Sequence, residues 1–254
     1  MHHFFVEPSQ IHTEEIEILG GDVNHMRNVL RMKEGEELVV NDGYGNAFEC
    51  RLLRFTEEAA WVSILEKRRV SCELPSKITL FQCLPKGDKM DLIIQKTVEL
   101  GVSKIVPVAS KRCVVKLDEK KKIHKQKRWQ AVAESAAKQS GRALIPQVMP
   151  VVDYMDALRR IEEQDLCLIP YECASELLED GKKSAMQRTR EILGAIQKGQ
   201  SVSIIIGPEG GFEKEEVEAA MKMGAEPVSL GRRILRTETA GLCILSVLMF
   251  QLEE

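Results

Sequence analysis

The segment Val202-Ser203-Ile204-Ile205-Ile206-Gly207-Pro208-Glu209-Gly210-Gly211-Phe212 joins an apolar run directly to a turn that contains three glycines. The run over 202–206 has the length and the β-branched content of a buried strand, and helical spacing of apolar residues begins after Glu213. Glycines between a strand and a helix allow the backbone to come close to a ligand. The segment therefore predicts an α/β fold with a binding loop at residues 207–212.

The same alternation of strands and helices continues on both sides of this segment. Apolar, strand-like runs lie at 78–84, 105–109, 166–169 and 227–230. Between the first two runs, one helical face collects Met90, Ile93, Ile94, Thr97 and Val98, and Gly101 is a suitable helix stop. Strands that alternate with helices indicate a mostly parallel sheet covered on both faces, with ligands bound beyond the carboxyl ends of the strands.

The N-terminal part of the chain has a different pattern. Short apolar runs alternate there with turns rich in Asn, Asp and Gly, which predicts a small β-barrel. Residues 22–31 predict a short helix capped by Asp22, with Met26, Val29 and Leu30 directed inward. A polar run over 66–75 then predicts a linker. We therefore expect two domains, 1–73 and 74–254.

The glycine turn at 207–212 is a poor site for a phosphate group. It lacks the closing Lys-Ser/Thr of a P-loop and the G-x-G-x-x-G spacing, and Glu209 stands where an anionic phosphate would lie. A carboxylate in a glycine turn suits a ligand with hydroxyls or positive charge, and S-adenosylmethionine offers both in its ribose and its sulfonium. The alternative is a tight turn in which Glu209 only complements the dipole of the next helix.

A second loop, residues 230–240, lies between the last strand and the C-terminal helix. Thr237 is a suitable helix cap, and Glu238 near the helix start complements the helix dipole. A purely structural role does not explain the arginines that surround the apolar pair Ile234-Leu235, namely Arg232, Arg233 and Arg236. We interpret the loop as an apolar slot for a flat base beside guanidinium groups for a phosphate or a developing oxyanion.

Charge is distributed unevenly along the chain. The formal net charge is −3, so the whole molecule does not have the charge of a typical nucleic-acid-binding protein. Between Lys104 and Arg128, however, ten basic residues accompany two acidic ones, whereas residues 1–72 carry eight basic and thirteen acidic residues. Because charges act within a Debye length of about 8 to 10 Å, the local cluster fits a phosphate-binding face. The alternative is a solvated loop at Lys120, Lys121 and Lys122.

Neither a disulfide framework nor a metal site is indicated. The seven cysteines are odd in number and never at C-x-x-C spacing, and the five histidines form no H-x-x-x-H or H-E-x-x-H pattern. We expect buried, reduced thiols and no metal. The longest apolar run, 241–250, is about half the roughly 20 residues of a membrane-spanning helix, and the N-terminus lacks the pattern of a secretory signal. We therefore expect a cytoplasmic protein without a membrane span.

Two C-terminal motifs carry a resemblance to a known family. Gly207-Pro208-Glu209-Gly210-Gly211-Phe212 is followed by Leu230-Gly231-x-Arg233-Ile234-Leu235-Arg236-x-Glu238-Thr239-Ala240. Together these motifs resemble the RsmE family of 16S ribosomal RNA methyltransferases, which belongs to the SPOUT class and methylates N3 of one uridine in the small ribosomal subunit. Segments 84–90, 97–102, 112–116 and 137–142 also match that family, and 25–32 is similar to its short helix in a PUA-like barrel. His2 and His3 stand where that family has a basic residue, so they receive no role.

The resemblance implies a definite architecture and cofactor. It implies a small PUA-like β-barrel over 1–73 and a SPOUT-type α/β domain over 74–254 with a deep trefoil knot. It also implies a homodimer that uses S-adenosylmethionine and acts on ribosomal RNA of the small subunit. The residues implied to bind the cofactor come from three loops, beginning at Ile169, Gly207 and Leu230, and are Pro170, Gly207, Pro208, Glu209, Gly210, Gly211, Leu230, Gly231, Ile234 and Leu235.

Methylation of uridine N3 sets the chemical requirements of such a site. The imide proton must leave, and negative charge spreads over the base carbonyls. We expect Arg236 to supply the stabilising cation and Glu238, or else Glu209, to accept the proton. Because N3 lies on the Watson–Crick edge, the target uridine must be unpaired or extruded.

Several residues are expected to contact RNA. Arg27 and Arg31, one helical turn apart, are placed to contact the same stretch of backbone, or else they are solvated and balance nearby acids. Others come from the motifs shared with the family: Lys86, Lys89, Arg112, Gln139 and Arg142.

Two other function classes stay open. A non-catalytic RNA-binding factor of ribosome assembly would explain the barrel and the lysines, but it leaves the glycine turn and the arginine loop without purpose. An α/β enzyme that acts on a phosphorylated nucleotide is disfavoured by the missing basic residue in the glycine turn.

Overall fold

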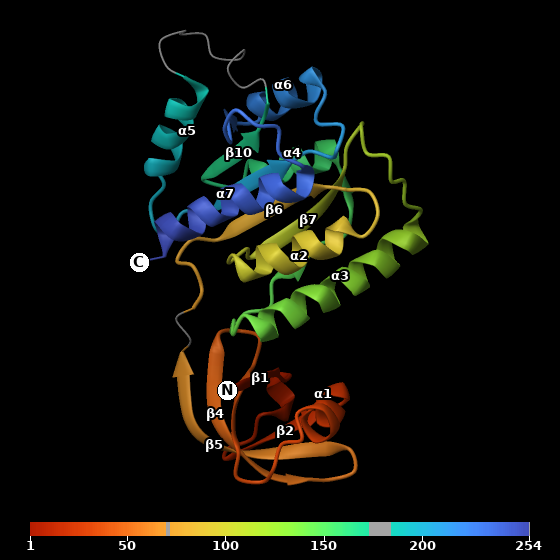
Figure 1. The fold of residues 1–254 in the computed structure, drawn as a ribbon, viewed down its shortest axis with the longest axis vertical. Coiled ribbons are helices and arrows are strands. Elements are labelled where there is room, and N and C mark those ends of the chain that lie inside the picture. Colours follow the sequence, from red (N-terminus) through yellow and green to blue (C-terminus); the bar gives the residue numbers. More distant parts are fainter. Residues whose placement is uncertain (70–71, 173–183, 254) are drawn as a thin grey trace. The chain divides into compact units, whose positions relative to one another are not determined.

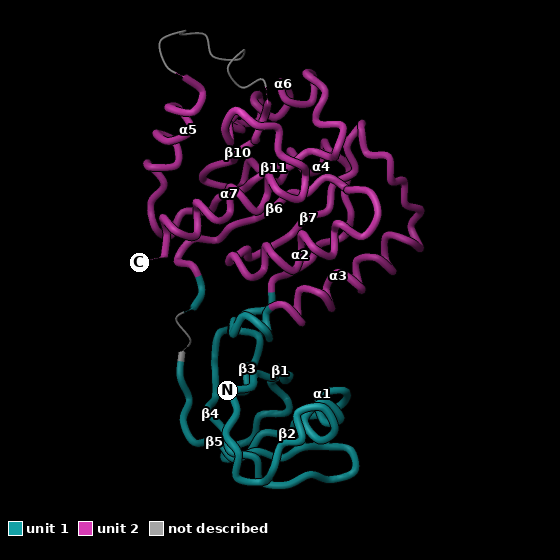
Figure 2. Tube along the Cα trace, in the orientation of Figure 1, with its two compact units in different colours: residues 1–73, 137–145 teal, residues 74–136, 146–254 magenta. Residues whose placement is uncertain are grey.

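The computed structural model describes residues 1–69, 72–172 and 184–253. The chain divides into two compact units (Figure 2). Unit one consists of residues 1–73 together with 137–145, and unit two consists of 74–136 together with 146–254. Within the described residues, no helix is both long and apolar enough to cross a membrane.

Unit two contains a parallel sheet, as the alternation of strands and helices predicts. In its described part, seven strands pair in the order β12-β10-β11-β6-β7-β8, with β9 also paired to β7, and every pairing is parallel. Their bounds are β6 Ile78–Cys83, β7 Lys104–Ala109, β8 Gln147–Val148, β9 Val152–Asp153, β10 Leu166–Pro170, β11 Val202–Ile206 and β12 Ala225–Val228. The central strands β6 and β11 are buried along their whole length, which explains their continuous apolar sequences.

Helices connect these strands (Figure 1). Their bounds are α2 Lys89–Glu99, α3 Glu119–Gln139, α4 Tyr154–Ile161, α5 Ala185–Gly194, α6 Lys214–Lys222 and α7 Thr237–Leu252. The five residues predicted to form the inner face of α2 are all buried, so that prediction is confirmed. Figure 1 shows α2 and α7 side by side in front of β6, and the two helices pack against each other.

The last strand of the sheet is shifted from its predicted position. β12 covers Ala225–Val228, whereas the apolar run 227–230 predicted a strand two residues further on. The turn that ends α6 places Gly224 at a φ of +90°, and the chain pairs with β10 immediately afterwards. Leu230 therefore belongs to the loop that follows the strand.

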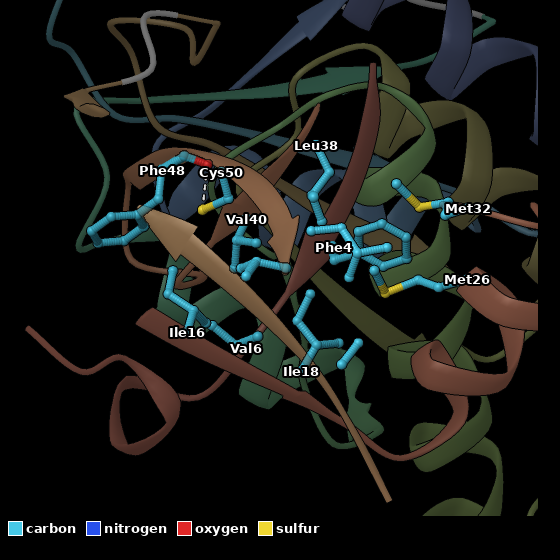
Figure 3. Close-up of a cluster of buried hydrophobic side chains, with 13 residues drawn as sticks. Phe4, Val6, Ile16, Ile18, Met26, Met32, Leu38, Val40, Phe48 and Cys50 are labelled. Carbon is cyan, nitrogen blue, oxygen red and sulfur yellow. Dashed lines mark hydrogen bonds between the residues drawn. The ribbon is translucent and has the colours of Figure 1, made fainter. Parts of the chain in front are cut away.

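Unit one is built on a small sheet. In its described part, five strands pair in the order β1-β3-β4-β5-β2, parallel between β1 and β3 and antiparallel elsewhere. Their bounds are β1 His2–Phe5, β2 Glu15–Leu19, β3 Glu37–Asn41, β4 Asn46–Phe55 and β5 Ala59–Arg69. Alternate residues such as Leu38 and Val40 point into one apolar core with Phe4 and Ile18 (Figure 3).

The predicted helix at 22–31 differs in detail from the helix that forms. Gly20, not Asp22, occupies the N-cap position of α1 (Gly21–Asn24), and a π-helical turn, η2 (His25–Val29), follows directly. Met26 is fully buried as predicted, and Leu30 packs partly against the core, but Val29 is 63% exposed. A π-turn has a wider spacing than 3.6 residues, so it rotates later side chains away from the predicted face.

Candidate active site at the carboxyl edge of the parallel sheet

Several loops of unit two meet at one edge of its sheet. Because all the strands are parallel, the segments that follow β6, β7, β10, β11 and β12 leave from the same edge. They include the glycine turn (residues 207–212), the arginine loop (residues 230–236) and residues 84–88 before α2. The sequence analysis placed ligand binding at this edge.

The glycine turn has a geometry that restricts side chains. Gly211 has a φ of +67°, and its N–H donates to the Pro208 carbonyl over 2.9 Å. A Cβ on Gly207 would lie 3.1 to 3.3 Å from ring atoms of Phe212, which is buried and contacts the ring of Tyr154. Glycine is therefore required at position 211 by backbone conformation and favoured at 207 by close packing.

A buried hydrogen-bond chain joins the glycine turn to the start of α7. Thr237 Oγ1 donates to the Gly207 carbonyl over 2.6 Å and accepts from Gln82 Nε2 over 2.9 Å. Thr237 was predicted to cap α7, but Arg236 occupies the N-cap position and Thr237 is the first helical residue. Its hydroxyl therefore connects three segments rather than capping one helix.

A charged connection lies at the same three segments. Lys89 Nζ is 3.0 Å from Glu209 Oε1 in the glycine turn and 3.2 Å from Glu238 Oε2 in the first turn of α7. The backbone N–H of Lys86 also donates to Glu209 Oε1, over 3.0 Å. Glu209 was expected to meet the positive charge of a ligand, yet the chain itself already supplies a cation to this carboxylate.

These contacts shift the ionisation of both partners. Burial raises the pKa of the Glu209 carboxyl, but hydrogen bonds from the Lys86 N–H and the Lys89 ammonium outweigh it, and the net pKa lies below the usual value. Hydrogen bonds to Glu209 and then to Glu238 raise the pKa of Lys89. Glu209 is therefore a carboxylate and Lys89 an ammonium at neutral pH.

The loop after β7 holds the other side of the glycine turn. Arg112 Nη1 donates to the Gly210 carbonyl over 2.9 Å, and Arg112 Nε lies 3.8 Å from Glu213 Oε1. The neighbouring Lys111 donates its backbone N–H to Glu216 Oε1 over 3.0 Å and pairs with Glu213 through its side chain. Arg112 was predicted to contact RNA. In the structure its guanidinium contacts Gly210 and Glu213 within the site.

Cys113 in this loop has an unusual environment. Its Sγ lies 3.4 Å from the Ser110 N–H and 3.3 Å from the Ser110 hydroxyl. A hydrogen bond from the Cys83 thiol, opposed by burial but aided by donors at Ser110 and Leu84, lowers the pKa of Cys113 to about 6. The cysteines were expected to be buried, reduced thiols. Among the described ones, Cys50, Cys83, Cys113 and Cys167 are buried, Cys243 is half-buried and Cys72 is exposed, while Cys173 lies outside the described residues.

The arginine loop presents its cations and one apolar side chain outward. Arg232, Arg233 and Arg236 are exposed, and Gly231 has a φ of +117°. Ile234 is 77% exposed, whereas Leu235 is half-buried, so the expected apolar slot is not closed around both residues. Within the described part of the chain, Arg236 has no ion-pair partner, which leaves its guanidinium available at the start of α7.

Pro170, predicted to line the first cofactor loop, is the last residue of β10. The next residue, Tyr171, donates its N–H to the Val228 carbonyl over 3.0 Å, which places the start of this loop beside the end of β12. Among the described residues, no group of three or more His, Cys, Asp or Glu is placed to hold a metal ion.

The predicted RNA-contacting residues of unit one have different environments. Arg142 is only 5% exposed and pairs with Glu73 over 2.5 Å, so it holds unit one together and does not present its charge to a phosphate. The Arg27 guanidinium donates to the Thr56 carbonyl and lies over the Phe55 ring at 5.0 Å. Arg31 follows the helix with a φ of +53°, so it does not share a helical face with Arg27.

A solvated loop was the alternative to a phosphate-binding face for the lysines at 120–122, but these residues are helical. Lys120, Lys121 and Lys122 lie in the first turn of α3, so a loop at this position is ruled out. Lys121 pairs with Asp118 over 3.1 Å, and Lys122 pairs with Glu119 over 2.7 Å. Gln139 is exposed at the other end of this helix.

Comparison with known proteins identifies the class to which this fold and site belong. A family model described as "RNA methyltransferase domain" matches residues 72–249, and one described as "RNA methyltransferase PUA domain" matches residues 18–65. The small sheet of unit one is therefore a PUA-like domain, and the larger sheet belongs to an RNA methyltransferase.

Individual relatives match along the whole chain. The ribosomal RNA small subunit methyltransferase E of Bacillus subtilis is 37% identical over 100% of this chain and 98% of its own length. A crystal structure of the enzyme of that name from Neisseria gonorrhoeae, bound to S-adenosyl methionine, is 32% identical with a TM-score of 0.82, covering 98% of this chain and 97% of the other. A putative methyltransferase from Legionella pneumophila in complex with the same cofactor is also 32% identical, with a TM-score of 0.81 and coverage of 98% and 96%. The chain belongs to the ribosomal RNA small subunit methyltransferase E family.

Proposed function

We propose that this protein transfers the methyl group of S-adenosylmethionine to N3 of a uridine in the 16S ribosomal RNA of the small ribosomal subunit. One observation carries the proposal. The two loops whose sequences define the family resemblance are joined directly, through Thr237 to Gly207 and through Lys89 to Glu209 and Glu238. We place this activity in the cytoplasm.

The residues at the sheet edge fit the proposed cofactor. Glu238 Oε2 is buried, and apart from its ion pair with Lys89 it has no hydrogen-bond donor among the described residues. A Cβ built on Gly211 meets nothing within 4 Å, so there is open space above the turn. The residues proposed to hold the cofactor are Pro170, Gly207, Pro208, Glu209, Gly210, Gly211, Leu230, Gly231, Ile234 and Leu235.

Arg236 and Glu238 are proposed to act on the base. When bound, S-adenosylmethionine supplies an electrophilic methyl group on a sulfonium, which N3 attacks. Arg236 stabilises the negative charge that spreads over the uridine carbonyls, and one well-placed donor of this kind contributes about 3 to 4 kcal/mol. The Glu238 carboxylate accepts the imide proton of N3, which leaves negative charge on the base. That charge is neutralised when N3 bonds to the methyl group and the sulfur keeps the electron pair of the broken sulfur–methyl bond.

Two domains divide this work in our proposal. Residues 74–254 contain the methyl-transfer site, and residues 1–73 contact RNA through the PUA-like sheet. Lys86, exposed before α2, and Gln139, exposed at the end of α3, are the remaining proposed contacts with RNA. The strands β10, β11 and β12 are neighbours whose carboxyl ends lie at one sheet edge, and this arrangement supports the proposal that the C-terminal segment forms a deep trefoil knot.

A homodimer is also proposed. Its support is the apolar surface of the C-terminal helix, where Phe250 is 87% exposed and Val247 is 45% exposed, together with exposed Ile234 before that helix. Sedimentation equilibrium tests this directly. We expect a dimer that Phe250→Glu converts to a monomer, and a monomeric wild-type protein at micromolar concentration would contradict the proposal.

Calorimetry and product analysis test the function itself. We expect binding of S-adenosylmethionine but not of ATP, and formation of 3-methyluridine in small-subunit RNA, detected by mass spectrometry of nucleosides after digestion. RNA binding without binding of the cofactor would favour an assembly factor. Preferential binding of ATP would favour an enzyme that uses a phosphorylated nucleotide.

A further inference from the structure

Lys89 occupies a position that helix formation does not explain. It is the first residue of α2, where the positive end of the helix dipole disfavours a cation. Its Nζ nevertheless lies within 3.2 Å of two carboxylates, Glu209 and Glu238, that come from segments far away in the sequence. The contacts of the lysine are therefore with these carboxylates and do not stabilise its own helix.

Two separate sets of contacts join the same three segments. The first is buried and uncharged, and runs from Gln82 at the end of β6 through Thr237 to Gly207. The second is charged and partly exposed, and consists of Lys89 with its two glutamates. Because the first set does not include Lys89, we expect the fold to persist when the lysine is replaced. The charged set is thus available for a role in the site.

Lys89 is a cation that the two glutamates share. Each has an oxygen within ion-pair distance of one ammonium, so the two carboxylates face each other across it. Without that cation they would repel each other, and like charges in a shared site drive one group to take up a proton. A neutral Glu209 would also weaken the charged connection between the glycine turn and the start of α7, and only the buried connection through Thr237 would remain at full strength.

We propose that Lys89 is a positioning residue, whose ammonium holds the side chains of Glu209 and Glu238 together and so fixes the glycine turn against the first turn of α7. This inference rests on the proposed function, because it assigns the effect of the lysine to the methyl-donor site. It replaces the expectation that Lys89 contacts RNA phosphates. Lys86, three residues earlier, keeps that expected role because only its backbone N–H is used by Glu209.

The test compares three variants of the full chain. Lys89→Met removes the charge and keeps much of the apolar stem, and Lys89→Arg restores a cation. Lys96→Met on the same helix is the matched control, because among the described residues Lys96 forms an ion pair only with the nearby Glu99, over 2.8 Å. Thermal unfolding should be cooperative in all three, as expected if the buried contacts hold the fold.

The first measurement uses the protein without cofactor or RNA. Carboxyl-carbon NMR titration, with Glu209→Gln to assign the signal, should show that Lys89→Met moves the ionisation of Glu209 to higher pH. Lys89→Arg should move it back, and Lys96→Met should leave it unchanged. If the Glu209 titration is the same with and without Lys89, the proposal is wrong. This result does not depend on whether the protein methylates RNA.

The second measurement separates positioning from RNA contact. Lys89→Met should raise the dissociation constant for S-adenosylmethionine by about tenfold, as for loss of one charge-assisted contact, with partial recovery in Lys89→Arg. The salt dependence of RNA binding should stay at the wild-type slope. A slope lowered by about 0.7 to 0.9, with unchanged affinity for S-adenosylmethionine, would make Lys89 a phosphate contact and overturn the proposal. If wild-type protein does not bind the cofactor at all, the proposed function fails, while the NMR titration still tests the ion pairs.

Discussion

The hydroxyl of Thr237 donates to the backbone carbonyl of Gly207 over 2.6 Å, so the first residue of α7 is tied to the first residue of the glycine turn. The same oxygen accepts from Gln82 Nε2, and Gln82 is fully buried. A buried polar group that loses its partner keeps the cost of its desolvation. Removal of this hydroxyl should therefore destabilise the site.

Thr237→Val removes the hydroxyl at similar volume, and we expect it to lower the free energy of unfolding by about 1 to 3 kcal/mol. It should also weaken binding of S-adenosylmethionine, because the glycine turn loses its link to α7. Urea unfolding and calorimetry measure the two effects. Thr239→Val, at an exposed position of the same helix, is the control and should change stability by no more than about 0.5 kcal/mol.

Arg236→Ala should reduce the single-turnover rate of methyl transfer by on the order of a hundredfold while cofactor affinity changes little, because the guanidinium acts on charge that develops only during reaction. Arg232→Ala removes an exposed arginine from the same loop and serves as the comparison. Near-normal turnover of Arg236→Ala would remove this residue from the proposed mechanism.

Cys113 predicts a pH dependence of stability. Its pKa of about 6 in the folded protein lies below the ordinary value of 9.0, so between these values the unfolded chain binds more protons than the folded one. The free energy of unfolding should therefore rise with pH across this window, and the gain should be lost as pH falls through about 6. Cys113→Ser should remove this rise, whereas Cys243→Ser should retain it. Urea unfolding across the window, combined with thiolate ultraviolet absorbance, provides the measurement.

The lysines at the start of α3 test the basic segment. Replacing Lys120, Lys121 and Lys122 together by Glu suits the positive end of the helix dipole, so the helix should remain folded. RNA binding should weaken, and each lost phosphate contact should lower the slope of log affinity against log salt by roughly 0.7 to 0.9. A slope equal to that of the wild-type protein would show that these lysines are solvated and do not contact RNA phosphates. A control variant with the same charge change carries Glu at Lys198, Lys214 and Lys222.

The pair formed by Arg142 and Glu73 should stabilise unit one. Arg142→Met leaves a partly buried carboxylate without its main cation, and loss of one partner of a buried ion pair costs about 3 to 5 kcal/mol. Arg51→Met breaks an exposed pair with Glu37 in the same unit, and its cost should stay below about 1 kcal/mol. Hydrogen exchange at β3 and β4 measures both. Equal protection in the two variants would mean that the Arg142 pair adds nothing.

The helices and strands whose apolar residues recur at a regular spacing could be predicted from the sequence. The buried face of α2 and the strand β11 follow from spacing alone, because burial in a layered fold imposes that spacing. The π-turn at His25–Val29 could not be predicted from the sequence, since its hydrogen-bond pattern depends on how Met26 and Leu30 pack against the core. Local pattern therefore predicted the elements better than their irregularities.

The partners of charged residues were beyond the reach of sequence. Glu209 was correctly chosen as a notable carboxylate, but its cation is Lys89, which lies 120 residues away. Arg142 belongs to a motif that suggested RNA contact, and only the three-dimensional structure shows Glu73 beside it. A sequence motif marks residues that act together, whereas the fold determines which partner each charged side chain contacts.

Unit one is assembled from two separate stretches of chain, 1–73 and 137–145. During synthesis the ribosome must therefore add residues 74–136 between the two stretches before unit one has all its parts. Glu73 can form its ion pair only after Arg142 has been synthesised. Asp22 likewise forms its ion pair with Lys138, over 2.9 Å, only after that lysine has been added. Domains that fold as they emerge normally finish in order from the N-terminus. Here the ion pair between Glu73 and Arg142 cannot form until all of α3 has been synthesised, although the apolar core of unit one lies within its first stretch.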